Sequence, residues 1–252
     1  MLLVIHMNPM PEVIIDPDRI DTWPLWLTDW AEFSALRFND GNYEVPNFGV
    51  DPEHEDDFRA MFQGQCVVAH HFSRLFDHEV EEIKVNGLKR LTKDMLYRKI
   101  QVAHEYELIT EEHHKLFEHC NVIASGDSDH RAGQICLVVS TGGLNQDVGA
   151  VYWLLTLWGG EALSMSNRSS GMKEILRNYG RPAIVVAAIK VDAPHKMNPA
   201  YPSLSSTFLR RYLGQEALSD FFVRSEDIPG KRILDVCQPG HPRYEKFTNF
   251  PR

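Results

Sequence analysis

The chain has 252 residues, of which 43% are hydrophobic and 24% are charged, and its formal net charge is −9. This length allows one large domain or two small ones, and the composition excludes a wholly disordered chain. The acidic balance argues against a general polyanion-binding protein, because neutralising phosphates requires clustered Lys and Arg.

The acidity is concentrated in the first quarter of the chain. Residues 1–60 hold 13 acidic and 3 basic residues, whereas residues 61–252 hold 22 and 23. The first segment also contains Trp23, Trp26 and Trp30, whose spacing of three and four favours one stripe of a short helix packed in a core. We therefore divide the chain into an acidic, Pro- and Trp-rich N-terminal extension, residues 1–60, and a second domain, residues 61–252.

The cysteines and the apolar segments indicate a cytoplasmic protein. Four cysteines are widely spaced without a CxxC pair, which favours reduced thiols. The N-terminus lacks the basic region of a signal peptide. The most apolar stretch, residues 148–158, has about half of the roughly 20 residues that a membrane helix needs. We expect no membrane association.

The predicted elements become distinct from residue 66 onward. Residues 66–72 form a short apolar run typical of a buried strand. Asp77 is positioned to cap a helix that ends at Asn86 and Gly87, and Thr92 is positioned to cap a second helix. A third helix is expected after Thr110.

Strands predominate in the second half of the chain. The pattern predicts strands over 135–140, 161–166, 183–191, 221–223 and 233–236, and an apolar helix over 148–158 that Asp147 caps. Most helices thus fall between residues 77 and 120. This distribution predicts an α+β fold with the helices segregated to one side of the sheet.

One strand end combines groups that could hold a dinucleotide. His71, Ser73 and Arg74 follow one another where the strand over 66–72 gives way to a helix. An imidazole can bond a ribose hydroxyl, a serine can bond a second ribose or an amide, and an arginine can bind the pyrophosphate. The alternative from the residues alone is a pair of strand-end histidines beside an arginine in a surface salt bridge.

The segment His71-Phe72-Ser73-Arg74, followed by a helix and Gly87-Leu88, resembles the first motif of the ADP-ribosyltransferase superfamily, which includes diphtheria-toxin-like and poly(ADP-ribose)-polymerase-like enzymes. The order of expected elements over residues 66–236 is similar as well. The segment 158–161, Trp-Gly-Gly-Glu, is similar to one in uncharacterised bacterial proteins. The resemblance implies a split antiparallel sheet that holds NAD in a cleft, with His71 on a ribose hydroxyl and the backbone beside Phe72 on the nicotinamide amide.

The chemistry of that superfamily requires a carboxylate, because cleavage of the nicotinamide–ribose bond passes through an oxocarbenium-like state. Glu161 is the first candidate, since it follows two glycines and lies between apolar segments; a simple turn position is the alternative. The superfamily's glutamate usually lies at the start of the strand before the closing strand. Asp220 occupies that place here, and its shorter side chain would disfavour efficient transfer.

Two further residues are candidates for NAD binding. Tyr152 could stack on nicotinamide, as could Trp153 and Tyr179, although Tyr152 and Trp153 lie in an apolar helix and core packing is the favoured alternative. Arg131 precedes a strand and could bind a second phosphate. A solvated loop is the alternative for that segment.

The spacing of the histidines does not favour a metal site. His114 and Glu118 are one helical turn apart and could share a ligand, but no HExxH motif or finger-type cysteine pair is present. We therefore expect a solvated, charged helix and no metal. A basic run between Lys84 and Lys99 is interpreted as a solvated face, with nucleic-acid binding as the alternative.

Together these patterns predict an NAD-dependent ADP-ribosyltransferase that modifies a protein or nucleic-acid acceptor, as a bacterial toxin or phage-defence effector with an antitoxin or chaperone as a further partner. Two alternatives stay open. One is an NAD glycohydrolase or an RNA 2′-phosphotransferase-like enzyme. The other is a catalytically silent binding module on the same fold, which recognises a partner through its acidic N-terminus. We also expect that the acidic segment lies across, or regulates, the dinucleotide cleft.

Overall fold

Two ten-residue strands form the middle of the sheet. In the computed structural model, which describes residues 12–38, 52–126, 132–141, 148–164, 171–191, 204–215 and 221–246, β2 (Cys66–Leu75) pairs with β4 (Arg181–Lys190) along its whole length. Both strands are rich in β-branched and small apolar residues, and β4 is buried at all eight interior positions. A strand covered on both faces requires such a continuous apolar run.

The remaining strands extend this pair on both sides. The strand order is β5-β3-β2-β4-β6, and every neighbouring pair in it is antiparallel. The flanking strands are β3 (Ile135–Val138), β5 (Phe221–Arg224) and β6 (Ile233–Cys237). A two-residue strand, β1 (Ile14–Ile15), pairs in parallel with the start of β2. The sheet is therefore mixed and open, in an α+β fold.

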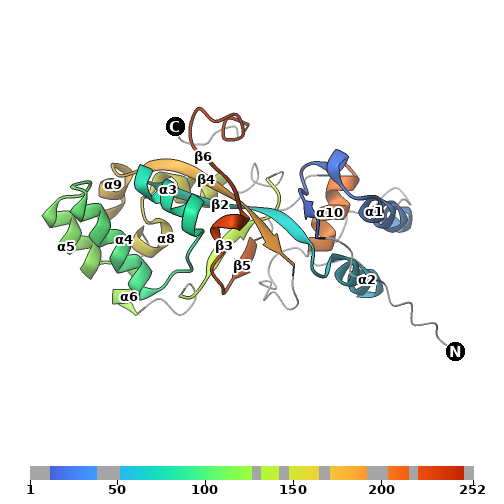
Figure 1. Cartoon of the computed structure of the whole chain (residues 1–252), viewed down its shortest axis with the longest axis horizontal. Helices are drawn as coiled ribbons and strands as arrows, with labels where there is room; N and C mark the ends of the chain where they lie inside the picture. Colours follow the sequence, from blue (N-terminus) through green and yellow to red (C-terminus); the bar gives the residue numbers. More distant parts are fainter. Residues whose placement is uncertain are drawn as a thin grey trace.

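The helices gather at both ends of the sheet (Figure 1). One group is α3 (Asp77–Asn86), α4 (Lys93–Glu105), α5 (Glu111–His119), α6 (Val122–Ser125), α8 (Gly160–Ser164) and α9 (Met172–Arg177). The other is α1 (Leu25–Phe38), α2 (Pro52–Phe62) and α10 (Leu204–Tyr212). Short 3₁₀ turns cover Ile20–Thr22 and Gly230–Arg232.

The helices do not lie on one side of the sheet, so that part of the prediction is wrong. One sheet face, with Val67 and Val185, packs in a core that includes residues of α1, α2, α3 and α10. The opposite face, with Val68 and Val186, packs against α7 (Val148–Thr156). Both faces of the central strands are apolar, and each therefore requires its own cover.

Several local predictions are confirmed and two need correction. Thr92 and Thr110 cap α4 and α5 as expected, each accepting a backbone N–H with its side chain. The residue that caps α3 is Phe76, one position before Asp77, and Glu79 accepts the Phe76 N–H at 2.8 Å. The predicted strand over 161–166 is wrong where the structure describes it, because Glu161 lies in helix α8.

The described part of the first 60 residues shares the core of the sheet. Trp23 and Trp30 are buried in the same cluster as Val67 of β2, which confirms core packing for these two tryptophans. Asp18 accepts hydrogen bonds from Ser140 and Thr141, which follow β3 after one intervening residue. These contacts attach the region to the sheet, while its division from the rest of the chain as a separate unit stays a prediction.

Helix length bears on membrane insertion. Within the described ranges, no helix combines the length and the apolar character that crossing a bilayer requires.

Replacement of Gly87 by Ala tests how closely the end of α3 approaches the loop before β6. Gly87 has φ +81°, and a Cβ there would lie 1.8 Å from the Ile228 carbonyl oxygen. We expect Gly87→Ala to lower the free energy of unfolding by about 3 kcal/mol or more, measured by urea denaturation. Gly126→Ala, at φ +80° with no atom within 4 Å, should cost only about 1 kcal/mol. Equal losses would contradict the close approach.

Candidate functional site

Strand alternation divides the four predicted NAD-binding residues between the two faces of β2. Successive side chains of a strand point to opposite faces. His71 and Ser73 lie on the face of Ala69 and Leu75, whereas Phe72 lies on the face of Val68. The sequence places these groups within four residues, but the strand divides them into His71 and Ser73 on one face and Phe72 and Arg74 on the other.

His71 is held in a defined protonation state by the neighbouring strand. Its Nδ1 lies 2.9 Å from the Cys136 carbonyl oxygen of β3, and burial lowers the pKa of the imidazole, against the opposing effect of this bond. A carbonyl oxygen only accepts, so Nδ1 carries the proton and donates it. In the neutral ring, Nε2 is then an acceptor. An acceptor of this kind can receive a hydrogen bond from a sugar hydroxyl.

Phe72 and Arg74 are occupied on the other side of the strand. Phe72 is 3% exposed in the cluster with Val151 and Leu155 of α7. The Arg74 Nε donates to the Tyr179 carbonyl oxygen at 2.6 Å, and burial lowers the pKa of its guanidinium. Arg74 thus secures the loop before β4, and its guanidinium comes from the face opposite to His71.

A buried carboxylate that the sequence analysis missed lies in the first turn of α3. The Glu79 carboxylate accepts a hydrogen bond from the Lys99 ammonium of α4. It accepts a second, at 3.0 Å, from the indole N–H of Trp158 in the turn before α8. Its side chain is only 10% exposed, and that of Lys99 is 16% exposed. With the Phe76 N–H, Glu79 therefore joins three segments. The detectable signal was its position three residues after the helix cap, where a Glu commonly closes the first turn.

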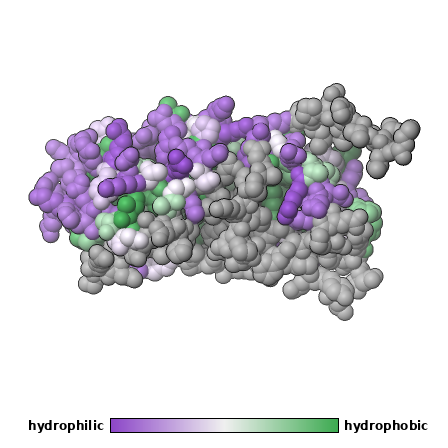
Figure 2. Space-filling model, turned by 90° about the horizontal axis from the view of Figure 1, so that it is seen from below, coloured by the Kyte–Doolittle hydropathy of each residue, from purple (hydrophilic) through white to green (hydrophobic). Residues whose placement is uncertain are grey.

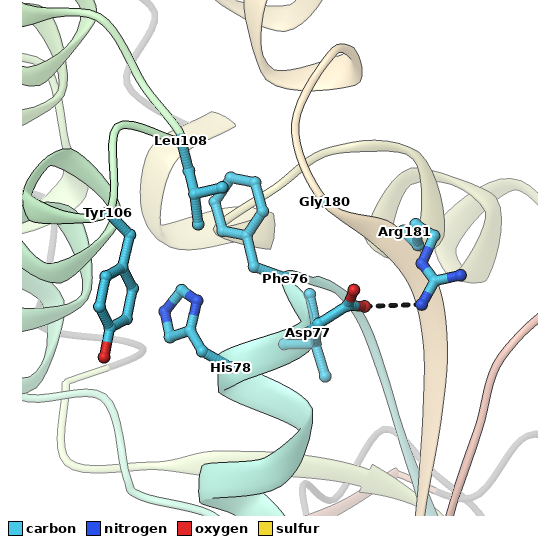
Figure 3. Close-up of a pocket in the computed structure, with 8 residues that line it drawn as sticks. Phe76, Asp77, His78, Tyr106, Leu108, Gly180 and Arg181 are labelled. Atoms are coloured by element: carbon cyan, nitrogen blue, oxygen red, sulfur yellow. Dashed lines mark hydrogen bonds and ion pairs between the residues drawn. The ribbon is translucent and has the colours of Figure 1, made fainter.

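A pocket opens where β2 ends and α3 begins (Figure 3). It measures about 430 Å³ and is open to solvent. Three aromatic rings line it, from Phe76, His78 and Tyr106. The centroid of the His78 ring lies 5.9 Å from that of Phe76 and 5.0 Å from that of Tyr106. Its remaining lining residues are Leu75, Asp77, Leu108, Gly180 and Arg181.

One charge pair forms the polar wall of this pocket. Arg181, at the start of β4, binds the Asp77 carboxylate at 2.6 Å and also donates to Gln238. Arg181 and Asp77 are both largely exposed, so the guanidinium keeps access to a ligand. Flat aromatic rings beside an arginine suit a planar, anionic or phosphate-bearing molecule.

The other predicted site residues are dispersed. Glu161 is half-buried in α8, between the core helices α6, α7 and α9, and its neighbours Ala162 and Leu163 belong to a different hydrophobic cluster from the one beside His71. Tyr152 is 41% exposed on α7, so its predicted core packing is wrong, as is that of Trp153. Asp220 and Arg131 lie outside the described residues.

Three of the six Lys and Arg residues in the basic run, residues 84–99, form ion pairs within the protein. Lys84 pairs with Glu81, Lys89 pairs with Asp227, and Lys99 is the buried partner of Glu79. Cations that are already neutralised by carboxylates release fewer counterions from a nucleic acid. The arrangement therefore gives little support to a phosphate-binding stripe along α3 and α4.

Comparisons of this chain with protein-family models, with curated proteins and with solved structures found no match. Any functional conclusion consequently depends on the geometry described above and on the motif of residues 71–88.

Replacement of Glu79 tests whether it joins the sheet to the helices. Glu79→Ala leaves the Lys99 ammonium and two N–H groups without their acceptor. We expect a loss of about 3 kcal/mol in the free energy of unfolding, measured by urea denaturation. Glu81→Ala is the matched control on the same helix, because its pair with Lys84 is exposed and should contribute under about 0.5 kcal/mol. Similar effects of both variants would refute the role of Glu79.

Stability should fall as the pH decreases through the range of histidine titration. Burial lowers the pKa of His71 and also that of His70 in the folded protein, so between pH 7 and pH 5 the unfolded chain binds more protons. Stability is therefore greatest above about pH 6.5 and is lost below it. In urea denaturation at pH 7.5, 6.5 and 5.5, His71→Gln should reduce the slope by up to about 1.4 kcal/mol per pH unit. A wild-type slope in His71→Gln would disprove the buried neutral imidazole.

Proposed function

We propose that this protein is an NAD-dependent ADP-ribosyltransferase that modifies a macromolecular acceptor. The observation that carries the proposal is the neutral His71 on the central strand, with its Nδ1 proton committed to the Cys136 carbonyl and Nε2 left as an acceptor. That state suits the role that the motif resemblance gives to His71, which is to accept a hydrogen bond from a ribose hydroxyl. Ser73 supplies a hydroxyl on the same face.

The pocket of Figure 3 supports the proposal by its position along the strand. Leu75 lines the pocket and lies on the same face of β2 as His71, four residues or about 13 Å further along the strand. NAD is an extended ligand with two ring systems joined by a pyrophosphate. We therefore propose that His71 binds one ribose while the aromatic pocket takes one ring, with Arg181 as its nearest cation.

The sheet also supports the finer proposal of a split antiparallel core. The five strands β5-β3-β2-β4-β6 are antiparallel throughout, and β5 precedes the closing strand β6. Phe221, at the start of β5, pairs with Val138, which in turn pairs with His70. The start of β5 is thus two strands, or about 10 Å, from the middle of β2.

This register favours Asp220 over Glu161 as the carboxylate that stabilises the oxocarbenium-like state. Asp220 directly precedes β5, the strand on which the resemblance expects a carboxylate. Glu161 lies in α8, where its neighbours Ala162 and Leu163 pack in the hydrophobic cluster between the helices. We accordingly propose Asp220 for this role and keep Glu161 as the alternative.

Labelled NAD tests the proposal directly. The purified protein is incubated with NAD labelled in the adenylate part, together with a lysate of protein and RNA as acceptor. Free nicotinamide and label on a macromolecule are the expected products. Nicotinamide without transferred label would indicate an NAD glycohydrolase. No nicotinamide, with no NAD-induced rise in melting temperature, would refute the enzyme and leave a binding module.

Two pairs of variants assign the residues. His71→Gln should lower kcat/KM about tenfold by removing one hydrogen bond to ribose. His70→Gln is its control, because His70 bonds the Val138 carbonyl of β3 from the opposite face of the same strand. Asp220→Asn should lower kcat by about 10²-fold or more, and Glu161→Gln should not. The reverse result would assign the carboxylate to Glu161.

A further inference from the structure

The hairpin of α4 and α5 brings two histidines and a glutamate together outside the proposed NAD site. His104 lies at the end of α4, and Glu111 and His114 lie in the first turn of α5. The His104 Nε2 is 3.0 Å from the Glu111 Oε2, and the rings of His104 and His114 stack with centroids 4.6 Å apart. One potential ligand atom from each of the three residues lies within 4.8 Å of the other two.

His114 has a buried nitrogen that the protein does not satisfy. Its Nε2 is inaccessible to solvent and has no hydrogen-bond partner, and the nearest carboxylate oxygen, from Glu118, is 3.6 Å away. Buried polar atoms in proteins are nearly always bonded, so an unpaired ring nitrogen beside two carboxylates requires an explanation. A cation between the imidazoles and the carboxylates would satisfy it.

The surroundings orient the potential ligands. Lys115 binds the Glu111 Oε1 at 2.9 Å, which leaves Oε2 directed toward His104. Outer contacts of this kind fix the geometry of metal-binding carboxylates. The backbone of the hairpin is closed by the bond from the Leu108 N–H to the Ala103 carbonyl at 2.9 Å. Hydrophilic residues cover the end of the molecule where α5 lies (Figure 2). The side chains of His104 and Glu111 are 35% and 59% exposed, so an ion can reach the site from their side.

We infer that the α4–α5 hairpin binds one zinc ion through His104, Glu111 and His114, with Glu118 or a water as the fourth ligand. Two imidazoles and a carboxylate form a ligand set that zinc uses, whereas magnesium and calcium prefer oxygen ligands alone. Tetrahedral bonds of 2.0–2.1 Å place ligand atoms about 3.4 Å apart, so zinc binding requires the stacked His104 and His114 rings, now at an interplanar angle of 20°, to turn until a nitrogen of each faces the ion.

The spacing of residues in the sequence did not reveal this site, because its potential ligands come from two different helices. His114 and Glu118 are a turn apart on one helix, but the second imidazole comes from the preceding helix, seven residues before Glu111. The ion would pin α4 to α5 beside the turn that carries Tyr106 and Leu108, both of which line the pocket of Figure 3. Zinc would therefore stiffen one wall of that pocket without contacting a ligand in it.

A second group of potential ligands, Asp235, Cys237 and His241, is a poorer zinc site. Burial raises the pKa of the Cys237 thiol to about 12, with the Asp235 carboxylate adding to the effect. Zinc binds the thiolate, which this environment disfavours. The two groups differ in one measurable property, because only the second contains sulfur.

The test uses the whole protein after chelator treatment and removal of the chelator. We expect calorimetric titration with zinc chloride to show one site, and zinc but not magnesium to raise the melting temperature. Replacement by Co²⁺ should give a visible d–d spectrum without a thiolate charge-transfer band. Absence of zinc binding at micromolar concentration, or a thiolate band, would overturn the inference.

Variants locate the ion. His104→Ala and His114→Ala should weaken zinc binding by about 100-fold or more, and Lys115→Met by about tenfold. Glu111→Gln changes an exposed side chain and should also lower the affinity, which keeps the test valid if a histidine variant does not fold. His119→Ala, on the same helix but facing solvent, is the matched control and should bind as the wild type does. Wild-type affinity in His104→Ala and Glu111→Gln would refute the site.

Discussion

The ten-residue ladder between β2 and β4 is the constraint on which the rest of the structure depends. Its strands are apolar on both faces, so helices must cover each face, and α7 on one side and α1, α2 and α10 on the other do so. The same ladder sets the direction of every side chain in β2. It places His71 and Ser73 on one face and Phe72 on the other, because the side-chain period of a strand is two.

Polar groups inside this fold are joined to partners from distant segments. Glu79 connects α3 to α4 and to the turn before α8, and Asp18 connects the N-terminal region to the end of β3. Buried carboxylates require such partners, since an unpaired charge in a core is costly. The acidic residues near the N-terminus that the structure describes thus include some that serve as anchors, such as Asp18 and Glu12, the latter bound to Arg232.

The proposed NAD site and the proposed zinc site use different elements of the fold. The proposed NAD site uses the face of β2 that carries His71 and the aromatic pocket at the start of α3, and we assign its chemistry to His71 and a carboxylate before β5. The zinc site uses the α4–α5 hairpin, whose connecting turn forms a wall of that pocket. In these two proposals, binding of the dinucleotide and stiffening of its pocket are therefore separable.

Local signals along the chain determined the elements themselves. Thr92 and Thr110 predicted the starts of their helices, because a side-chain oxygen there accepts a hydrogen bond from a free backbone N–H within a few residues. The apolar runs of β2 and β4 predicted buried strands. The strand predicted over 161–166 was wrong at Glu161, because a short apolar run fits a strand or a buried helix equally well. Only the tertiary structure decided which partner each polar group contacts. His71 bonds the Cys136 carbonyl, Glu79 binds Lys99, and the ring of His104 stacks on that of His114. Capping and periodicity act over a few residues and are written in the sequence, whereas these contacts join segments whose approach depends on sheet register and helix packing.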